Sequence, residues 1–226
     1  MAALQGAAIL LLALVLAIAH GPFTVARLPE PDDGAALGKL PYTSLNTPRR
    51  VMWLMALAVV AQVATIAVAH PLRPIWLVYG ASAAALIWID ACTTWLPSKL
   101  SWLVTAELAV AFGICLLLCD DPKTLILRMG VGALASLAFW WVFWRFSRGA
   151  LGFGDVRLAP LTGAMAATFG MSGWFVGLLA GTAIGAIWGL LFARRYPAPG
   201  TERGFAYGPA LWAGPYIALI WASFAT

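Results

Sequence analysis

Long apolar segments follow one another along almost the whole chain, and they decide what it can fold into. A helix needs about 20 residues to cross the hydrocarbon core of a bilayer. Within that core only helices and closed barrels satisfy every backbone hydrogen bond. Eight suitable segments lie at residues 2–20, 51–70, 75–96, 101–119, 124–145, 155–171, 173–193 and 206–225. The pattern predicts an all-α polytopic membrane protein with about eight transmembrane helices.

The composition agrees with a membrane location. Hydrophobic residues make up 62% of the 226 residues, and charged residues make up only 10%. A soluble domain carries roughly 25% charged residues. The net charge of +5 would favour a nucleic-acid partner in a soluble protein, but here the basic residues lie in short clusters between apolar segments. We therefore expect the lipid bilayer, and no nucleic acid, as a partner.

The same basic residues predict how the chain is oriented. When the loops between the eight segments are assigned alternately to two sides, 11 of the 14 Lys and Arg residues fall on one side. The other side holds only Arg73, Lys123 and Arg128. Because loops rich in Lys and Arg stay in the cytoplasm, this bias places both chain ends outside it.

The N-terminal part of the chain holds the only long loop. Ala-Ile-Ala at residues 17–19 resembles a signal-peptide cleavage site. No basic residues precede the first apolar core, however, so we expect a retained helix. The Pro-rich stretch from Gly21 to Arg50 is predicted to be a flexible cytoplasmic linker. We expect residues 1–226 to form a single membrane-embedded domain.

Glycines recur every fourth residue in the segment at 173–193, at Gly177, Gly181, Gly185 and Gly189. At this spacing they line one face of a helix. Small residues on such a face let membrane helices approach each other closely, so the pattern predicts helix packing rather than a pore.

Two aspartates, Asp90 and Asp155, stand within or beside the apolar segments. An ionisable side chain in a membrane costs a few kcal/mol or more, and it therefore indicates pairing, transport or chemistry. Asp90 lies fifteen residues beyond Ile75, and Asp155 lies fifteen residues before Gly170. Each count corresponds to about 22 Å of helix, so both carboxyl groups are predicted to lie at one level, toward the cytoplasmic face.

Two neighbouring carboxylates can perform general acid and base catalysis, because both do not ionise easily at once. One deprotonates water while its protonated partner polarises a peptide carbonyl. Asp155 opens a helix, where negative charge is favoured, whereas Asp90 lies toward a helix end where it is not. We therefore expect Asp155 to be the base. Pro97 indicates that the helix continues for about a turn and a half beyond Asp90.

A structural interpretation of the same residues stays open. Asp155 could cap its helix, and either aspartate could pair with Lys99 or Arg157 at the membrane interface. Glu107, a third acid within an apolar segment, could support the site or extend its carboxylate toward water.

The sequence indicates no metal or cofactor site. Cys92, Cys115 and Cys119 form no CxxC pair and no cluster with His20 or His70. Zinc sites and disulfide frameworks both need such spacings.

Three stretches resemble the type IV prepilin peptidases, a family of membrane aspartyl proteases with a GxGD signature. Gly-Phe-Gly-Asp-Val-Arg-Leu at residues 152–158 carries the signature itself. Residues 89–100, an Asp followed by a polar stretch and Leu-Pro, are similar to the family's first-aspartate segment. Residues 205–211 are similar to its Phe-Gly-Pro segment. The resemblance covers roughly residues 51–225.

This resemblance implies an endopeptidase of the bacterial inner membrane whose catalytic pair is Asp90 and Asp155. Such enzymes remove the short basic leader from pilin-like or pseudopilin-like precursors at the cytoplasmic membrane face. The supporting motif positions are Gly152, Gly154, Pro97, Gly208 and Pro209. Lys99 or Arg157 would help to hold an acidic group of the precursor, and Arg157 stands where many members carry Lys.

The linker departs from the family pattern. Bifunctional members carry two CxxC pairs in a cytoplasmic domain and also methylate the new N-terminus. The Gly21–Arg50 segment contains no cysteine. The resemblance therefore implies a peptidase without a cofactor, and it leaves methyltransferase activity in doubt.

Other classes remain open. Presenilin-type and signal-peptide-peptidase-type proteases also carry GxGD, and Pro-Ala-Leu at residues 209–211 matches one of their segments. However, Ile89 stands where their first motif has Tyr. A proton-coupled transporter would place its carboxylates near the bilayer midplane between repeats. A structural membrane subunit would tolerate loss of either aspartate.

Overall fold

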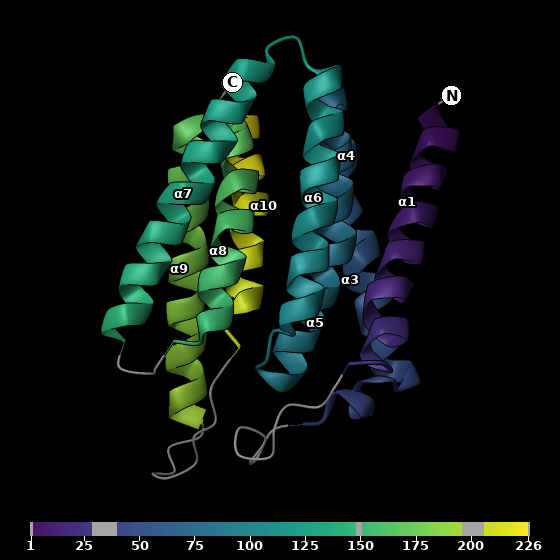
Figure 1. The fold of residues 1–226 in the computed structure, drawn as a ribbon, viewed down its shortest axis with the longest axis vertical. Helices are drawn as coiled ribbons and strands as arrows, with labels where there is room; N and C mark the ends of the chain where they lie inside the picture. Colours follow the sequence, from purple (N-terminus) through teal and green to yellow (C-terminus); the bar gives the residue numbers. More distant parts are fainter. Residues whose placement is uncertain (1, 29–39, 148–150, 196–205, 226) are drawn as a thin grey trace. The chain divides into compact units, whose positions relative to one another are not determined.

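The computed structural model describes residues 2–28, 40–147, 151–195 and 206–225, and within these ranges the regular structure is entirely helical (Figure 1). The chain divides into two compact units, residues 1–120 and residues 121–226. Each unit is a bundle of helices with its own core. The predicted all-α class is confirmed.

Within the described ranges, six helical stretches are long and apolar enough to cross a membrane: Leu4–Phe23, Pro48–Ala67, His70–Thr93, Ser98–Leu118, Pro122–Phe146 and Phe153–Phe192. The last stretch holds two helices, because Gly170 has φ +82° and the chain turns there. A further apolar helix runs from Gly208 to Ala225. The protein is therefore a polytopic membrane protein, and each of the eight predicted segments corresponds to helix.

The first unit is built around the helical stretch that carries Asp90. Its elements are α1 (Ala2–Ile18), η1 (Ala19–Phe23), η2 (Tyr42–Leu45), α3 (Pro48–Ala67), η3 (His70–Leu72), α4 (Arg73–Val78), η4 (Tyr79–Ala83), α5 (Ala84–Thr93) and α6 (Ser98–Leu118). α1 and α3 pack on η4, while α6 packs on α4. Of an 18-residue window within the His70–Thr93 stretch, 78% is buried, so the apolar side chains of this stretch form the core of the unit.

The predicted linker from Gly21 to Arg50 is helical at both ends. η1 carries the chain past Gly21 as a π-helical segment around Pro22, whose ring cannot fit a regular α-helical turn. At the other end α3 begins at Pro48, where the missing proline N–H costs nothing. The Thr47 hydroxyl caps this helix by accepting from the Arg50 amide at 3.4 Å. Residues 29–39 lie outside the described part of the chain.

The second unit is built around the helix that carries Asp155. Its elements are α7 (Pro122–Phe146), α8 (Phe153–Ala166), η5 (Ala167–Phe169), α9 (Gly170–Arg195) and α10 (Gly208–Ala225). α8 packs against α7, α9 and α10. α8 and α10 begin at the same end of the unit (Figure 1). The start of α7 is capped by the Asp121 carboxylate, which accepts from the Thr124 amide at 3.1 Å. Hydrogen bonds from Thr124 lower the pKa of Asp121.

The predicted packing role of the glycine face of α9 is confirmed for Gly177, Gly181 and Gly185. A side chain at Gly181 would stand 3.2 Å from the Ala210 carbonyl oxygen of α10. One at Gly185 would overlap the Tyr207 ring. From the α10 side, a methyl group at Gly214 would collide with the Gly177 carbonyl oxygen. α9 and α10 are therefore in backbone contact.

We expect Gly214→Ala to destabilise the protein by about 1–3 kcal/mol, because the new methyl group meets backbone that cannot rotate away. Gly130→Ala is the matched control, since nothing lies within 4 Å of a Cβ at Gly130 on α7. Helix propensity alone should make that control neutral or stabilising by up to about 1 kcal/mol. Unfolding of the full chain in detergent measures both. Equal stabilities would contradict the close α9–α10 contact.

Candidate functional site

Asp90 lies in the last turn of α5, and its side chain is buried, with 5% of the residue exposed. The Thr94 amide donates to the Asp90 carbonyl oxygen at 2.7 Å and ends the helix. Thr94 has φ +58°, a left-handed conformation that is unusual for a β-branched residue and costs about 1–3 kcal/mol. Such strain is common at functional sites.

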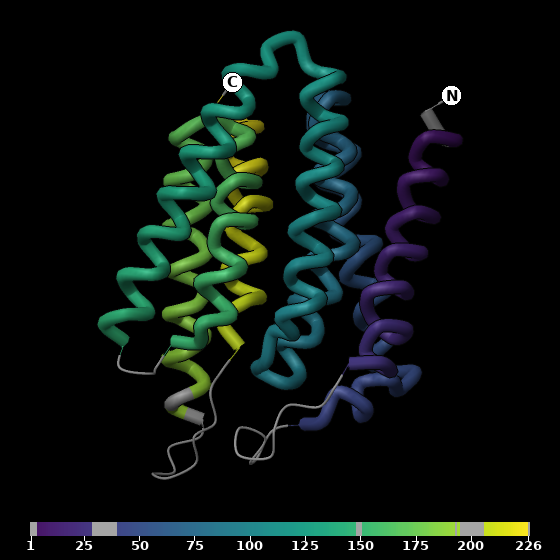
Figure 2. Tube along the Cα trace, in the orientation of Figure 1, coloured from purple at the N-terminus to yellow at the C-terminus, as the bar shows by residue number. Residues whose placement is uncertain are grey.

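α5 ends three residues after Asp90, so the expected extension of a turn and a half is wrong. The left-handed Thr94 stops the helix, and Pro97 disfavours helical backbone at the residue before it. Pro97 itself precedes the first residue of α6, where its carbonyl oxygen accepts from the Ser101 amide at 2.9 Å. Figure 2 shows the short connection from α5 to α6. Asp90 therefore lies less than one turn from a tight turn between two membrane helices.

The η2 segment packs against α5, the helix that carries Asp90. Its Tyr42 ring meets the Trp95 ring, with 6.2 Å between centroids. Arg50, in the first turn of α3, donates to the Ser44 carbonyl oxygen at 2.6 Å and so fixes η2 in place. Sequence analysis assigned these residues no role, because nothing in a loop pattern shows that the loop folds back onto a helix end.

Asp155 lies in the first turn of α8, and 7% of the residue is exposed. Gly152 precedes the helix, and its carbonyl oxygen accepts from the Asp155 amide at 3.2 Å. A Cβ at Gly152 would stand 3.6 Å from Asp155 Oδ2, so the carboxylate leans back over the helix start. Amide groups of a first turn have no helical partner and favour negative charge. Gly154, between these two residues, is half-buried.

Tyr207, directly before α10, lies near Asp155 in the second unit. Gly208 is buried at the first position of α10, followed by the half-buried Pro209. Tyr207 accepts the first amide hydrogen bonds of α10 and donates its hydroxyl to the Thr182 carbonyl oxygen at 2.9 Å. Asp155 lies close enough to interact electrostatically with the Tyr207 phenol. The sequence did not assign Tyr207 a role, although it lies within the third resembling stretch.

The two basic residues predicted to support the site lie at helix starts. Lys99 is exposed in the first turn of α6. Arg157 is half-buried in α8, with its guanidinium carbon 5.9 Å from the centroid of the Phe153 ring. Phe153 also packs edge-on against Trp144 of α7. An aromatic cluster therefore flanks the α8 start that holds Asp155.

The two aspartates have opposite helical environments. Asp90 lies at a helix C-terminus, which favours the protonated carboxyl group, and Asp155 lies at an N-terminus, which favours the carboxylate. Asp90 belongs to the first unit and Asp155 to the second. Their pairing stays a prediction, as does the role of each supporting residue.

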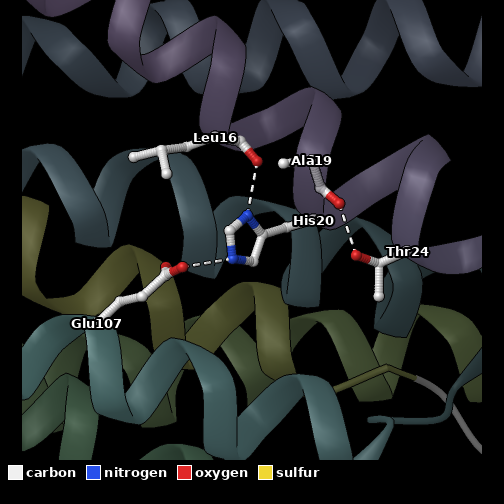
Figure 3. A network of polar contacts seen from close by, with 5 residues as sticks. All are labelled: Leu16, Ala19, His20, Thr24 and Glu107. Carbon is white, nitrogen blue, oxygen red and sulfur yellow. Dashed lines mark hydrogen bonds and ion pairs between the residues drawn. The ribbon is translucent and has the colours of Figure 1, made fainter.

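A buried polar pair that the sequence did not predict lies elsewhere in the first unit (Figure 3). His20 of η1 and Glu107 of α6 share a hydrogen bond of 2.7 Å between Nε2 and Oε1. His20 Nδ1 donates to the Leu16 carbonyl oxygen at 2.7 Å, since a carbonyl can only accept. The side chains are 5% and 25% exposed, respectively. In either charge state one proton lies between the two residues.

Glu107 does not extend toward water at a membrane face. α6 begins at Ser98, three residues earlier than the predicted segment. Glu107 is therefore near the middle of a 21-residue helix, about 14 Å from its start. A lone histidine at the end of one apolar segment and a lone glutamate inside another were the only signals for this pair. Neither says which helices become neighbours.

The fold and these residues define an all-α polytopic membrane protein with a buried aspartate at one end of the central helix of each unit. Among the described residues, no three His, Cys, Asp or Glu side chains gather into a metal-binding group. No protein-family model, curated protein or solved structure matches the chain. The assignment of an activity therefore depends on the residues themselves.

We expect the His20–Glu107 bond to appear as coupling in a double-mutant cycle. His20→Ala, Glu107→Ala and the double variant should show an interaction energy of about 1–3 kcal/mol, because either single change leaves a buried polar group unpaired. Unfolding of the full chain in detergent provides the stabilities. Thr24→Ala replaces His20→Ala in the control cycle, since Thr24 bonds only its own helix at Ala19. Additivity within about 0.5 kcal/mol in the His20 cycle would contradict a stabilising bond.

Proposed function

We propose that this protein is a membrane aspartyl endopeptidase that removes the leader peptide of type IV prepilin-like precursors at the cytoplasmic membrane face. The observation that carries the proposal is the placement of Asp90 and Asp155. Both are buried, at 5% and 7% exposure, at the ends of apolar helices. Burying two carboxyl groups beside a bilayer is costly, and catalysis by a carboxyl pair accounts for both.

The proposed reaction begins with one proton on Asp90 and none on Asp155. Asp155 removes a proton from water while the water oxygen attacks the scissile peptide carbonyl. The Asp90 hydroxyl donates a hydrogen bond to the carbonyl oxygen as negative charge develops there. Collapse of the tetrahedral intermediate breaks the C–N bond, and Asp155 returns its proton to the leaving amine. Both carboxyl groups then have their initial protonation.

The local helix geometry supports this division of roles. Unpaired amides at the start of α8 stabilise the Asp155 carboxylate, whereas the carbonyl end of α5 stabilises a protonated Asp90. Tyr207, close to Asp155 and anchored to the Thr182 carbonyl oxygen, restricts the space in which that carboxylate can move. Because coupled carboxyl groups titrate as a unit, the two roles describe the pair rather than two independent sites.

The proposed substrate has a basic leader followed by a hydrophobic helix that stays in the bilayer. Lys99 or Arg157 would help to hold an acidic group of that precursor. The bacterial inner membrane, with both chain ends outside, is the proposed location, since the bias of basic loops favours it. The proposed peptidase activity needs no cofactor, and we do not propose that the protein methylates the new N-terminus.

We expect Asp90→Asn and Asp155→Asn each to reduce leader removal by at least about a thousandfold, since loss of either member removes the acid–base pair. The protein is co-expressed with a prepilin-like precursor, and cleavage is followed by the mass of the product. Asp120→Asn is the matched control, because Asp120 is an exposed loop aspartate.

All variants are compared at equal abundance in the membrane. Normal cleavage by either variant would eliminate the two-aspartate mechanism. A wild-type protein that cleaves a presenilin-type transmembrane substrate and leaves the prepilin intact would instead favour the other GxGD class.

The pairing can be tested without a substrate. In a chain whose native cysteines are replaced by serine, Asp90→Cys and Asp155→Cys should be joined by a short thiol cross-linker, because carboxyl groups that share a proton lie in contact. A specific protease site inserted between Asp120 and Asp121 separates the two halves unless they are linked.

Leu117→Cys with Asp155→Cys is the control pair. Leu117 is 87% exposed and lies near the C-terminal end of α6, whereas the start of α6 is joined to the helix that carries Asp90. Equal yields for the two pairs would contradict a carboxyl pair.

A further inference from the structure

A groove of about 640 Å³ lies in the first unit between α1, α4 and α6. Its walls are almost entirely apolar and include Ile9, Leu12, Leu77, Val110 and Ile114. This volume is within the range of small-molecule sites, roughly 300–1,000 Å³. The groove is separate from the aspartates, because neither Asp90 nor Asp155 lines it.

The two ends of the groove differ in charge. Glu107, whose bond to His20 ties η1 to α6, lines one end (Figure 3). The other end carries positive charge and is lined by Leu118 at the end of α6, by His70 of η3 and by Arg73 at the start of α4. Eleven residues of α6 separate Glu107 from Leu118, which is about 16 Å of helix.

The length of the groove fits a lipid chain. The groove follows α6 for about 16 Å. One leaflet of a bilayer has a hydrocarbon depth of about 15 Å, half of the total. The groove therefore has the length of one acyl chain within a single leaflet.

Arg73 provides a binding group for a headgroup at the same end. Its Nε atom is buried, and no described residue forms a hydrogen bond with it. A buried donor without a partner costs stability unless something outside the chain accepts from it. Guanidinium groups bind phosphate through charge-assisted, often bidentate hydrogen bonds. His70, three residues earlier, lines the same end and can donate a further hydrogen bond.

We propose that this groove binds one anionic phospholipid, with an acyl chain between α1 and α6 and the phosphate on Arg73. The bound molecule belongs to the leaflet that faces the C-terminal end of α6. Its chain fills the space between α1 and α6 above the His20–Glu107 bond, and its phosphate pairs the free Arg73 donor. This site is independent of the proposed peptidase activity.

Native mass spectrometry of the delipidated full-length protein, titrated with phosphatidylglycerol or phosphatidylcholine of identical chains, tests the proposal. We expect the wild-type protein to bind phosphatidylglycerol more tightly than phosphatidylcholine. Arg73→Gln should weaken that binding on the order of tenfold, the effect of losing charge-assisted hydrogen bonds. Arg128→Gln, an exposed arginine of α7, should leave it unchanged.

A second pair of variants tests the groove itself. Ala106 and Ala109 are both exposed on α6, but only Ala106 lines the groove. Ala106→Phe should therefore abolish the tight site, and Ala109→Phe should not. Equal binding of the two lipids, an unaffected Arg73→Gln, or equal effects of the two phenylalanines would each overturn the proposal. If Arg73→Gln does not purify as a single species, the comparison of Ala106→Phe with Ala109→Phe decides whether the groove is the lipid site.

Discussion

The absence of water in the bilayer core is the constraint on which the rest of this structure depends. Backbone groups must bond within the chain, so the described membrane segments are helices, and each polar side chain needs a partner or a function. The His20–Glu107 bond gives two polar side chains of apolar helices a partner, and it joins η1 to α6. Burial of apolar surface drives little association between helices in lipid, so these helices depend on close packing. The glycines on α9 allow that close packing.

Each unit places one buried aspartate at an end of its central helix. In the first unit the α5 C-terminus is ended by the strained Thr94 and covered by η2. In the second unit the α8 N-terminus is bordered by Tyr207 and the start of α10. Helix ends are where a membrane protein keeps backbone groups that have no partner within the helix. The two ends have opposite polarity, which is the basis for the different roles proposed for the two carboxyl groups.

The helix boundaries show where the local sequence pattern was sufficient to predict the structure and where it was not. Apolar length identified the long described helices to within a few residues, because the bilayer imposes that length, but it did not identify the short η2 helix. The pattern placed the start of α6 three residues too late and the end of α5 three residues too far along. It also treated Gly21 and Pro22 as linker, although η1 continues through both. These errors come from caps and π-helical turns, whose stability depends on neighbouring helices as well as on local sequence.

The sequence by itself determined the all-α membrane class, the packing face of α9 and the position of Asp155 at a helix start. These features depend on hydrophobic length, four-residue spacing and turn-forming residues, all of which are local. Only the tertiary structure decided that Glu107 meets His20, that Tyr207 lies beside Asp155, that η2 covers α5, and that α1, α4 and α6 enclose a groove. These contacts join residues far apart in the chain, and they follow from which helices pack together, a choice that no single segment encodes.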